Sequence, residues 1–219
     1  MGITQNTGAS SLIKPGVIDN AAARPASPYE GQVIFQKDTD QLLVWNGSVW
    51  VIPNSPAQNP DGLEFIKSQT VGSAVTSVTV SDAFSATYDN YKIVINGGTT
   101  SAQTSISFTL GSSTNTYYGN YIYAYYFGGG PFAATINNSS NFIYAGGADI
   151  NYINCNIELQ NPFQAKFTAI QALTVCYANN RGSAYGEHET ASSYSAFTLA
   201  PYTGTLTGGT ITVYGYRKA

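Results

Sequence analysis

Short segments in which apolar and polar residues alternate are the sequence feature that most restricts the fold of this chain. Between Thr104 and Leu110, apolar residues alternate with Ser and Thr, which places the apolar side chains on one face of a strand. The same alternation returns at residues 151–159 and 209–216, and it is accompanied by further short strand-like segments, separated by Gly, Asn, Ser and Pro, at residues 75–80, 91–96, 167–177 and 194–199. It predicts an all-β protein in which residues 63–219 form an antiparallel, jelly-roll-like β-sandwich.

The low charge of the chain excludes several classes of partner. Lys and Arg together number 9 and Asp and Glu number 12, so 10% of the residues are charged and the net charge is −3. Such a surface lacks the basic footprint of a nucleic-acid-binding protein. No apolar stretch approaches the ~20 residues that a membrane helix needs. We therefore expect neither nucleic acid nor a membrane as a partner.

The start of the chain differs from the rest because residues 1–23 are small and polar and show no periodicity. A segment of this composition does not bury enough apolar surface to fold alone. We expect residues 1–28 to form an extended arm that is held by a partner surface and anchors the protein there.

Residues 29–53 carry a compact β pattern. Three short strands are predicted at residues 32–36, 41–45 and 48–52. A turn at residues 37–40 joins the first pair. The dipeptide Asn46-Gly47 is typical of a two-residue type I′ hairpin turn, which would join the second pair.

Three strands of this length cannot build an independent core. We therefore predict that copies of the three-stranded meander pack about an axis as a homotrimer, with the large rings of Phe35, Trp45 and Trp50 at the interface. The proline-rich residues 54–62 are expected to form a stiff linker to the sandwich.

Six tyrosines lie between residues 117 and 126. In a strand, Tyr121, Tyr123 and Tyr125 point to one face, which makes that face a candidate contact surface. Three interpretations are open: the rings pack between subunits, they contact a surface glycan or receptor, or they belong to the core of one subunit. Surfaces rich in Tyr, Ser, Gly and Asn are typical of adaptable binding sites.

Candidate catalytic or metal-binding groups are sparse. Glu187 and Glu189 flank the one histidine, His188, but in a strand the two acids point away from it, so the three groups do not converge. A solvated strand or an intersubunit hydrogen bond is the preferred interpretation. Asp38 and Asp40 share one face of a turn, and turn capping explains them better than calcium binding, which needs a longer run of oxygen ligands.

A glycan-cleaving enzyme would need two carboxylates that flank the glycosidic bond. Asp149 and Glu158 are one conceivable pair, but nothing in the sequence distinguishes it from other pairs. The chain also lacks the internal repeats of a long β-helix. We expect no catalytic residue, no cofactor and no metal.

The two cysteines are Cys155 and Cys176. If residues 161–166 form a hairpin turn, Cys155 pairs with Ala172, and Cys176 lies about four residues, or roughly 13 Å, further along. A disulfide needs Cα atoms about 5 to 6 Å apart. We expect both cysteines to be reduced core residues.

A resemblance to known proteins is carried first by the N-terminal module. The run from Arg24 to Phe35, followed by Asp38-Thr39-Asp40 and by Leu43 to Val51, resembles a module near the start of tailed-bacteriophage fibre and virion proteins. Nearly end to end, the chain also resembles a group of small structural proteins of marine phages. The segments that carry this second resemblance are residues 62–67, 84–93, 161–163, 197–199 and 204–216.

The resemblance implies a virion structural protein that is assembled in the cytoplasm of a host bacterium. In one interpretation it is a homotrimeric fibre or spike, which docks on other virion proteins through its N-terminal segment and carries the sandwich outward to a host glycan or receptor. In the alternative it is a capsid decoration or cement protein that staples the shell. A glycan-cleaving tail spike is a distant third, and we expect no enzyme.

Overall fold

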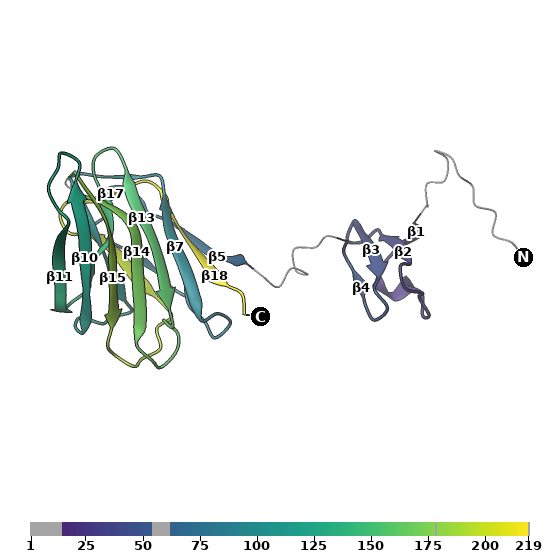
Figure 1. The fold of residues 1–219 in the computed structure, drawn as a ribbon. Coiled ribbons are helices and arrows are strands. Elements are labelled where there is room, and N and C mark those ends of the chain that lie inside the picture. The colour runs from purple at the N-terminus through teal and green to yellow at the C-terminus, as the bar shows by residue number, and fades with distance from the viewer. Residues whose placement is uncertain (1–14, 54–61, 178, 219) are drawn as a thin grey trace, which may run out of the picture. The chain divides into compact units, whose positions relative to one another are not determined.

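A computed structural model of the chain describes residues 15–53, 62–177 and 179–218, with the backbone alone described at residues 174–177. The chain divides into two compact units, Met1–Asn59 and Pro60–Ala219. Both are built from β-strands (Figure 1), which confirms the predicted all-β class. Half of the predicted arm, residues 1–14, and most of the predicted linker, residues 54–61, lie outside the described residues.

The smaller unit is a four-stranded sheet in the order β1-β2-β3-β4. Its strands β2 and β3 pair antiparallel, as do β3 and β4, and these are the three strands that the sequence predicts. The elements of this unit are β1 (Gly16–Ile18), the 3-10 helix η1 (Ala21–Ala23), β2 (Val33–Gln36), β3 (Gln41–Trp45) and β4 (Trp50–Val51).

Strand β1 is an addition that the sequence does not predict, because it lies in the part of the chain without periodicity. It pairs parallel to β2. The backbone N–H groups of Lys37 and Asp38 extend this pairing by donating to the carbonyl oxygens of Ile18 and Asp19, at 3.0 and 3.2 Å. The second half of the predicted arm therefore belongs to the small sheet.

The turn between β3 and β4 corrects the predicted type I′ turn. Trp45 pairs with Trp50, so the loop spans residues 46–49. The Asn46 side chain accepts the backbone N–H groups of Ser48 and Val49 at 3.0 and 2.9 Å. A type I′ turn needs positive φ at both central residues, whereas here Gly47 has positive φ and Asn46 does not. The Asn46 side chain instead organises a wider Asx turn.

The larger unit is an antiparallel β-sandwich. Its eight-stranded layer has the order β11-β10-β15-β14-β13-β7-β18-β5, and its four-stranded layer has the order β12-β9-β16-β6. A short pair, β17 and β8, lies apart from these layers. The strands are β5 (Leu63–Thr70), β6 (Val78–Val80), β7 (Asn90–Asn96), β8 (Thr99–Thr100), β9 (Thr104–Leu110), β10 (Tyr117–Tyr125), β11 (Phe132–Ser139), β12 (Phe142–Ala148), β13 (Ile153–Gln160), β14 (Thr168–Tyr177), β15 (Asn180–His188), β16 (Phe197–Pro201), β17 (Leu206–Thr207) and β18 (Thr210–Tyr216).

The two layers share one apolar core. Strand β13 joins them, since Cys155 near its start pairs with β12 of the four-stranded layer, whereas its second half pairs with β7 and β14 of the eight-stranded layer. Phe197 lies fully buried in this core, with its ring stacked against those of Phe84 and Phe108 at centroid distances of 5.6 and 5.3 Å. The sandwich thus closes its own interior.

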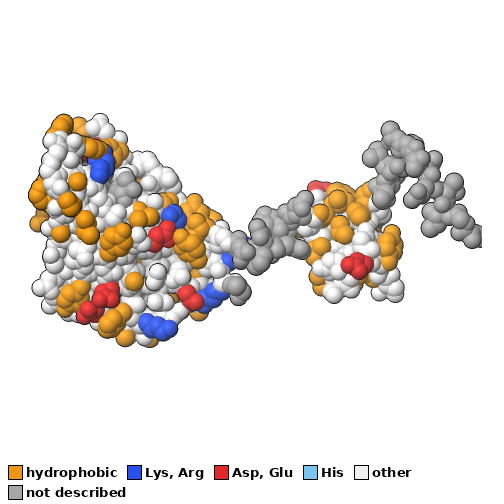
Figure 2. Space-filling view, in the orientation of Figure 1, with side chains coloured by type: hydrophobic (Ala, Val, Ile, Leu, Met, Phe, Trp, Pro, Cys, Tyr) orange, Lys and Arg blue, Asp and Glu red, His pale blue; other side chains and the backbone are white. Residues whose placement is uncertain are grey.

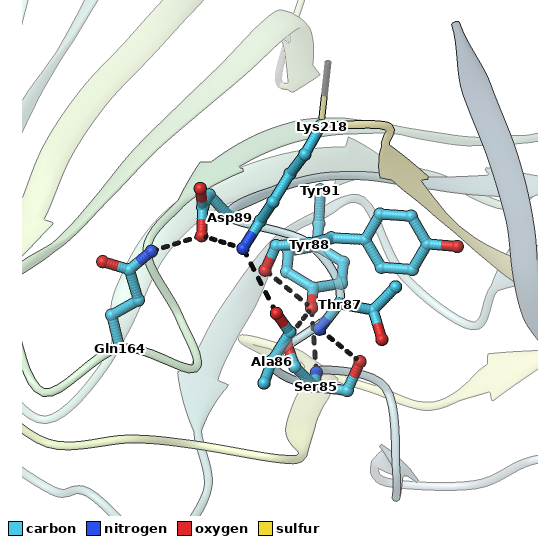
Figure 3. Close-up of polar contacts among 8 residues, drawn as sticks. All are labelled: Ser85, Ala86, Thr87, Tyr88, Asp89, Tyr91, Gln164 and Lys218. Atoms are coloured by element: carbon cyan, nitrogen blue, oxygen red, sulfur yellow. Dashed lines mark hydrogen bonds and ion pairs between the residues drawn. The ribbon is translucent and has the colours of Figure 1, made fainter. Parts of the chain in front are cut away.

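The loop that precedes β7 is held by a set of polar contacts around Tyr91 (Figure 3). The buried Tyr91 hydroxyl accepts the backbone N–H of Ser85 and donates to the Ser85 carbonyl oxygen, both at 2.8 Å. Lys218 Nζ lies 2.8 Å from the Asp89 carboxylate and donates to the Ala86 carbonyl oxygen, and Gln164 donates to Asp89. These contacts fix the loop and the C-terminal segment at the start of β7.

Candidate functional site

The predicted trimer-interface residues lie on opposite faces of the small sheet. Trp45 and Trp50 are cross-strand neighbours, and their ring centroids lie 5.6 Å apart in an edge-to-face arrangement. Because Ile34 pairs with Leu43, two residues before Trp45, the tryptophans share the face of Ile34. Phe35 follows Ile34 in β2 and therefore points to the other face. The structure does not bring Phe35 together with the two tryptophans.

The tryptophan face is covered by a segment of its own chain. Gln36 on this face is only 3% exposed. Its Oε1 accepts two hydrogen bonds from the Arg24 guanidinium, at 2.9 and 2.7 Å, and its Nε2 donates to Asp38 at 2.7 Å. The segment around Arg24 thus lies across this face, and Ile34 and Leu43 on the face are buried.

The opposite face of the small sheet is apolar at every strand position, and the described residues leave it partly exposed, with four of its six side chains half-buried and two exposed. Val17 is 59% exposed and Leu42 is 42% exposed on it. An antiparallel sheet with one solvated face normally carries polar residues there, so a continuous apolar face indicates a contact surface. We call it the open apolar face; its side chains are Val17, Val33, Phe35, Leu42, Val44 and Val51.

The three predicted contact tyrosines share one face of β10, but they differ in exposure. Tyr121 is buried, Tyr123 is half-buried and Tyr125 is 42% exposed. The Tyr121 ring stacks on those of Tyr123 and Tyr144, both at 4.9 Å, and its hydroxyl donates to Asn180 Oδ1 at 2.6 Å. Tyr121 therefore belongs to the core of one subunit, where neither a glycan nor a second subunit reaches it.

Two glycines of β15 make room for the large side chains beside them. Gly182 pairs with Tyr123, and a Cβ atom there would lie 2.7 Å from the Tyr121 ring. A Cβ atom at Gly186 would collide with the Tyr118 carbonyl oxygen and with the Phe142 ring. The tyrosine strand can thus pack inward only because its neighbour lacks side chains at these positions.

The tyrosine face ends in a cluster of exposed rings, which we call the aromatic edge: Tyr125, Tyr126, Phe127 and Phe132. Phe127 is 89% exposed, and the rings of Tyr125 and Phe132 lie 5.6 Å apart. The Arg181 guanidinium lies 4.0 Å above the centre of the Tyr126 ring. Strand β11 is one edge of the eight-stranded layer and β5, where the unit begins, is the other, so at ~4.8 Å per strand they are separated by about 33 Å.

The environment of His188 corrects the expected solvated or intersubunit position. Its ring is 1% exposed and stacks on Tyr117 with centroids 4.3 Å apart. The two ring nitrogens lie 2.8 Å from the Tyr194 hydroxyl and 3.2 Å from the Thr116 hydroxyl. Burial lowers the pKa of His188 below its ordinary value. Glu187 and Glu189 are exposed, as the alternation predicts, so His188 is a core residue within the chain.

The proposed carboxylate pairs have local partners. Asp38 accepts a hydrogen bond from the Gln36 side chain, whereas the expected turn capping would need a backbone N–H group as the donor. Asp149 accepts the backbone N–H groups of Asn151 and Tyr152, while Glu158 accepts from Lys92 Nζ at 2.6 Å. In the described part of the chain, no three His, Cys, Asp or Glu side chains are grouped as a metal ion requires.

Cys155 is a buried free thiol, and burial raises its pKa to about 12. The expected register is wrong by two residues, because Ile157 and not Cys155 pairs with Ala172. The reason is that the loop between β13 and β14 spans residues 161–167 and Ala169 pairs with Gln160. The side chain of Cys176 lies outside the described residues.

Two further findings bear on the kind of site to expect. Among the described residues, no helix has the length and apolarity to cross a membrane. The chain matches no known protein-family profile, no curated protein sequence and no solved structure. The open apolar face and the aromatic edge both offer exposed apolar contact area.

Proposed function

We propose that this chain is a structural protein of a tailed-bacteriophage virion, most simply a homotrimeric fibre or spike. In this proposal the N-terminal segment docks on other virion proteins and the sandwich faces outward, where it contacts the host. The resemblance of residues 24–51 to phage fibre modules supports the class of protein. The observation that carries the oligomeric part is the open apolar face.

The open apolar face supports self-association because a β-sheet needs a second layer to bury each apolar face. The strand positions on this face carry no charged side chain, so identical faces meet without burying an unpaired charge. Three such faces about an axis would enclose an apolar interior. In this arrangement Phe35 lies at the trimer interface, whereas Trp45 and Trp50 support the sheet from its other side.

The aromatic edge supports an outward contact. It lies at the edge of the eight-stranded layer opposite β5, through which the chain enters the sandwich. Its rings offer large rigid contact area at small entropic cost, and the sandwich needs none of the exposed ones for its own core. We assign the host-contact role to Tyr125, Tyr126, Phe127 and Phe132, and we withdraw it from Tyr121.

Sedimentation of the purified chain tests the trimer. We expect a species of three times 23.3 kDa at micromolar concentration. Leu42→Lys places a charge on the open apolar face and should yield folded monomers. Val49→Lys places the same charge at a 55% exposed position in the β3–β4 loop and should leave the trimer intact. A wild-type monomer at micromolar concentration, or a trimer unaffected by Leu42→Lys, contradicts the proposal.

Incorporation into particles tests the virion role. Deletion of residues 1–14 keeps β1 and should leave the trimer folded but unable to join the virion. In a virion reconstruction, the fibre proposal requires attachment at the tail or at a vertex. Regular coverage of the capsid lattice would instead support the capsid-decoration alternative, in which the aromatic edge contacts neighbouring shell proteins.

A further inference from the structure

The outward face of the eight-stranded layer carries two parallel rows of side chains that run across the strands. Register places the first row on β10, β15, β14, β13, β7 and β18 in turn, as Asn120, Tyr185, Gln171, Glu158, Lys92 and Tyr214. The second row lies two residues further along each strand, as Tyr118, Glu187, Ala169, Gln160 and Asn90. Tyr216 continues the second row on β18. The residues of each row are far apart in sequence.

Three adjoining hollows lie between these rows. One of about 270 Å³ is bounded by Tyr118, Asn120, Tyr185 and Glu187, with the backbone of the paired Gly119 and Gly186 as its floor. A second, of about 230 Å³, and a third, of about 250 Å³, continue it toward β7 and β18.

The hollows form one trough because neighbouring hollows share walls. Tyr185 and Gly186 line the first and second, and Glu158, Gln160 and Gln171 line the second and third. Ala169 gives the second hollow its depth, since it is the one short side chain in the second row. From β10 to β18 the trough crosses five strand spacings, or about 24 Å.

The chemistry of the trough is polar and weakly charged. Glu158 at its middle accepts from Lys92 Nζ at 2.6 Å and from the Tyr216 hydroxyl at 2.7 Å, so the Lys92 charge offsets its own. Burial and the neighbouring Glu158 raise the pKa of Tyr216 to about 12, which keeps that hydroxyl protonated as a donor. In the described part of the chain, the side-chain amides of Asn90, Asn120, Gln160 and Gln171 make no hydrogen bond within the protein.

The rings and the shape add two constraints. Tyr185 is 43% exposed and Tyr216 is 37% exposed, so each presents ring surface at the trough. Each hollow is smaller than the ~300–1,000 Å³ of an enclosed small-molecule pocket, and all three are open to solvent. The trough thus fits a long thin ligand rather than a compact one. Figure 2 shows that this view of the larger unit is dominated by uncharged atoms, with few charged side chains.

We propose that the trough binds an extended, uncharged oligosaccharide. Ring faces of Tyr185 and Tyr216 would contact its pyranose faces, and the free amides would bond its hydroxyls. An extended peptide is disfavoured because it seeks unpaired backbone groups at a sheet edge, whereas the trough crosses strands whose backbone groups are already paired. A polyanion is disfavoured because the lining holds the carboxylates of Glu158 and Glu187 and no basic side chain, and the neighbouring Lys92 is already paired with Glu158.

The inference deepens the proposed function and rests on its host-contacting part, but the trough is separate from the aromatic edge. It names the class of host molecule, a neutral surface glycan. A single weak site would gain avidity from copies within a trimer and from many trimers on a particle.

The test is binding of the purified full-length chain to an array of neutral and acidic oligosaccharides, followed by titration of the best neutral binder. Ala169→Leu fills the trough without removing any contact, and Tyr185→Ala removes a ring. Each should weaken binding about ten-fold or more. If either of these variants loses the native circular dichroism spectrum, Gln171→Ala serves as a milder third variant.

Matched controls place the same changes elsewhere. Ala133→Leu adds the same side chain on β11, and Tyr202→Ala removes a 67% exposed ring outside the trough. Both should bind within about two-fold of the wild type. Absence of binding to every neutral oligosaccharide, preference for acidic ones, or loss of binding in Tyr125→Ser but not in Ala169→Leu overturns the inference. A trimer that binds no sugar contradicts this inference alone, and a sugar-binding monomer contradicts the trimer alone.

Discussion

The small sheet and the sandwich are both β structures, yet they differ in how much of their apolar surface they bury. Of the buried apolar residues in the described chain, the small sheet contributes Ile34 and Leu43, and the sandwich contributes all the others. The sandwich provides two layers that cover each other, whereas the small sheet covers one face with its own chain and leaves the other partly exposed. A sheet completes its core only when both faces have a partner.

This difference is measurable because both tryptophans of the chain, Trp45 and Trp50, lie in the small sheet. Tryptophan fluorescence therefore reports unfolding of the small sheet, and circular dichroism is dominated by the larger sandwich. If the two units are independent, a destabilising change in one should move one signal and leave the other in place.

The largest expected effect is in the sandwich core. Phe197→Ala removes a fully buried ring that stacks on Phe84 and Phe108. We expect the free energy of unfolding of the sandwich to fall by about 3–5 kcal/mol. In denaturant titration the circular dichroism transition should shift to lower concentration while the tryptophan transition stays in place. Equal shifts of both signals would show that the two units unfold as one.

The reverse experiment uses Leu43→Ala in the small sheet. Leu43 is 3% exposed and pairs with Ile34 beneath the Arg24 segment. The expected loss is about 2–5 kcal/mol, which is comparable to the whole stability of a small unit. The tryptophan transition should therefore move to much lower denaturant or disappear, and sedimentation should detect monomers. A trimer that persists with native tryptophan emission would contradict the role given to this sheet.

The smallest expected effect is a pH dependence confined to the sandwich, which holds the one histidine. Burial lowers the folded-state pKa of His188, so the unfolded chain binds the proton more readily. The contribution of neutral His188 to sandwich stability is therefore complete above the pKa of histidine in the unfolded chain, near 6.5. It falls as the pH drops from about 7 to about 5. His188→Phe, which keeps a ring beside Tyr117, should flatten this dependence of the circular dichroism midpoint.

The small sheet should respond to acid in a different range. The Lys37 ammonium, which hydrogen-bonds Asp19, lowers the pKa of that carboxylate, so this contribution is lost only as the pH falls below about 4. A tryptophan transition that shifts between about pH 7 and pH 5 would contradict the separation of the two units.

The amino-acid sequence alone is enough to establish the class of fold and several strands. β3 and β9 have the bounds that the sequence predicts, and for β9 the reason is its period-two alternation, which is a local property that needs no knowledge of neighbours. It also determined that Glu187 and Glu189 point away from His188.

Other features depended on contacts between distant segments. The sequence did not predict β12, where Gly146 and Gly147 interrupt the alternation, or β1, whose three residues pair with residues eighteen positions later. The alternation that grouped Tyr121, Tyr123 and Tyr125 on one face could not say how deeply each is buried. Their burial depends on the glycines of β15, the next strand in space.

Which residues meet across strands depends on the tertiary structure. Phe35 lies on one face of the small sheet and the two tryptophans lie on the other. The tryptophan face is an interior face only because the segment around Arg24 packs across it. The trough joins Tyr185, Gln171 and Glu158 through the register of three strands. Register is set by loop lengths and by packing of the opposite face, and a two-residue error, as with Cys155, brings different side chains together.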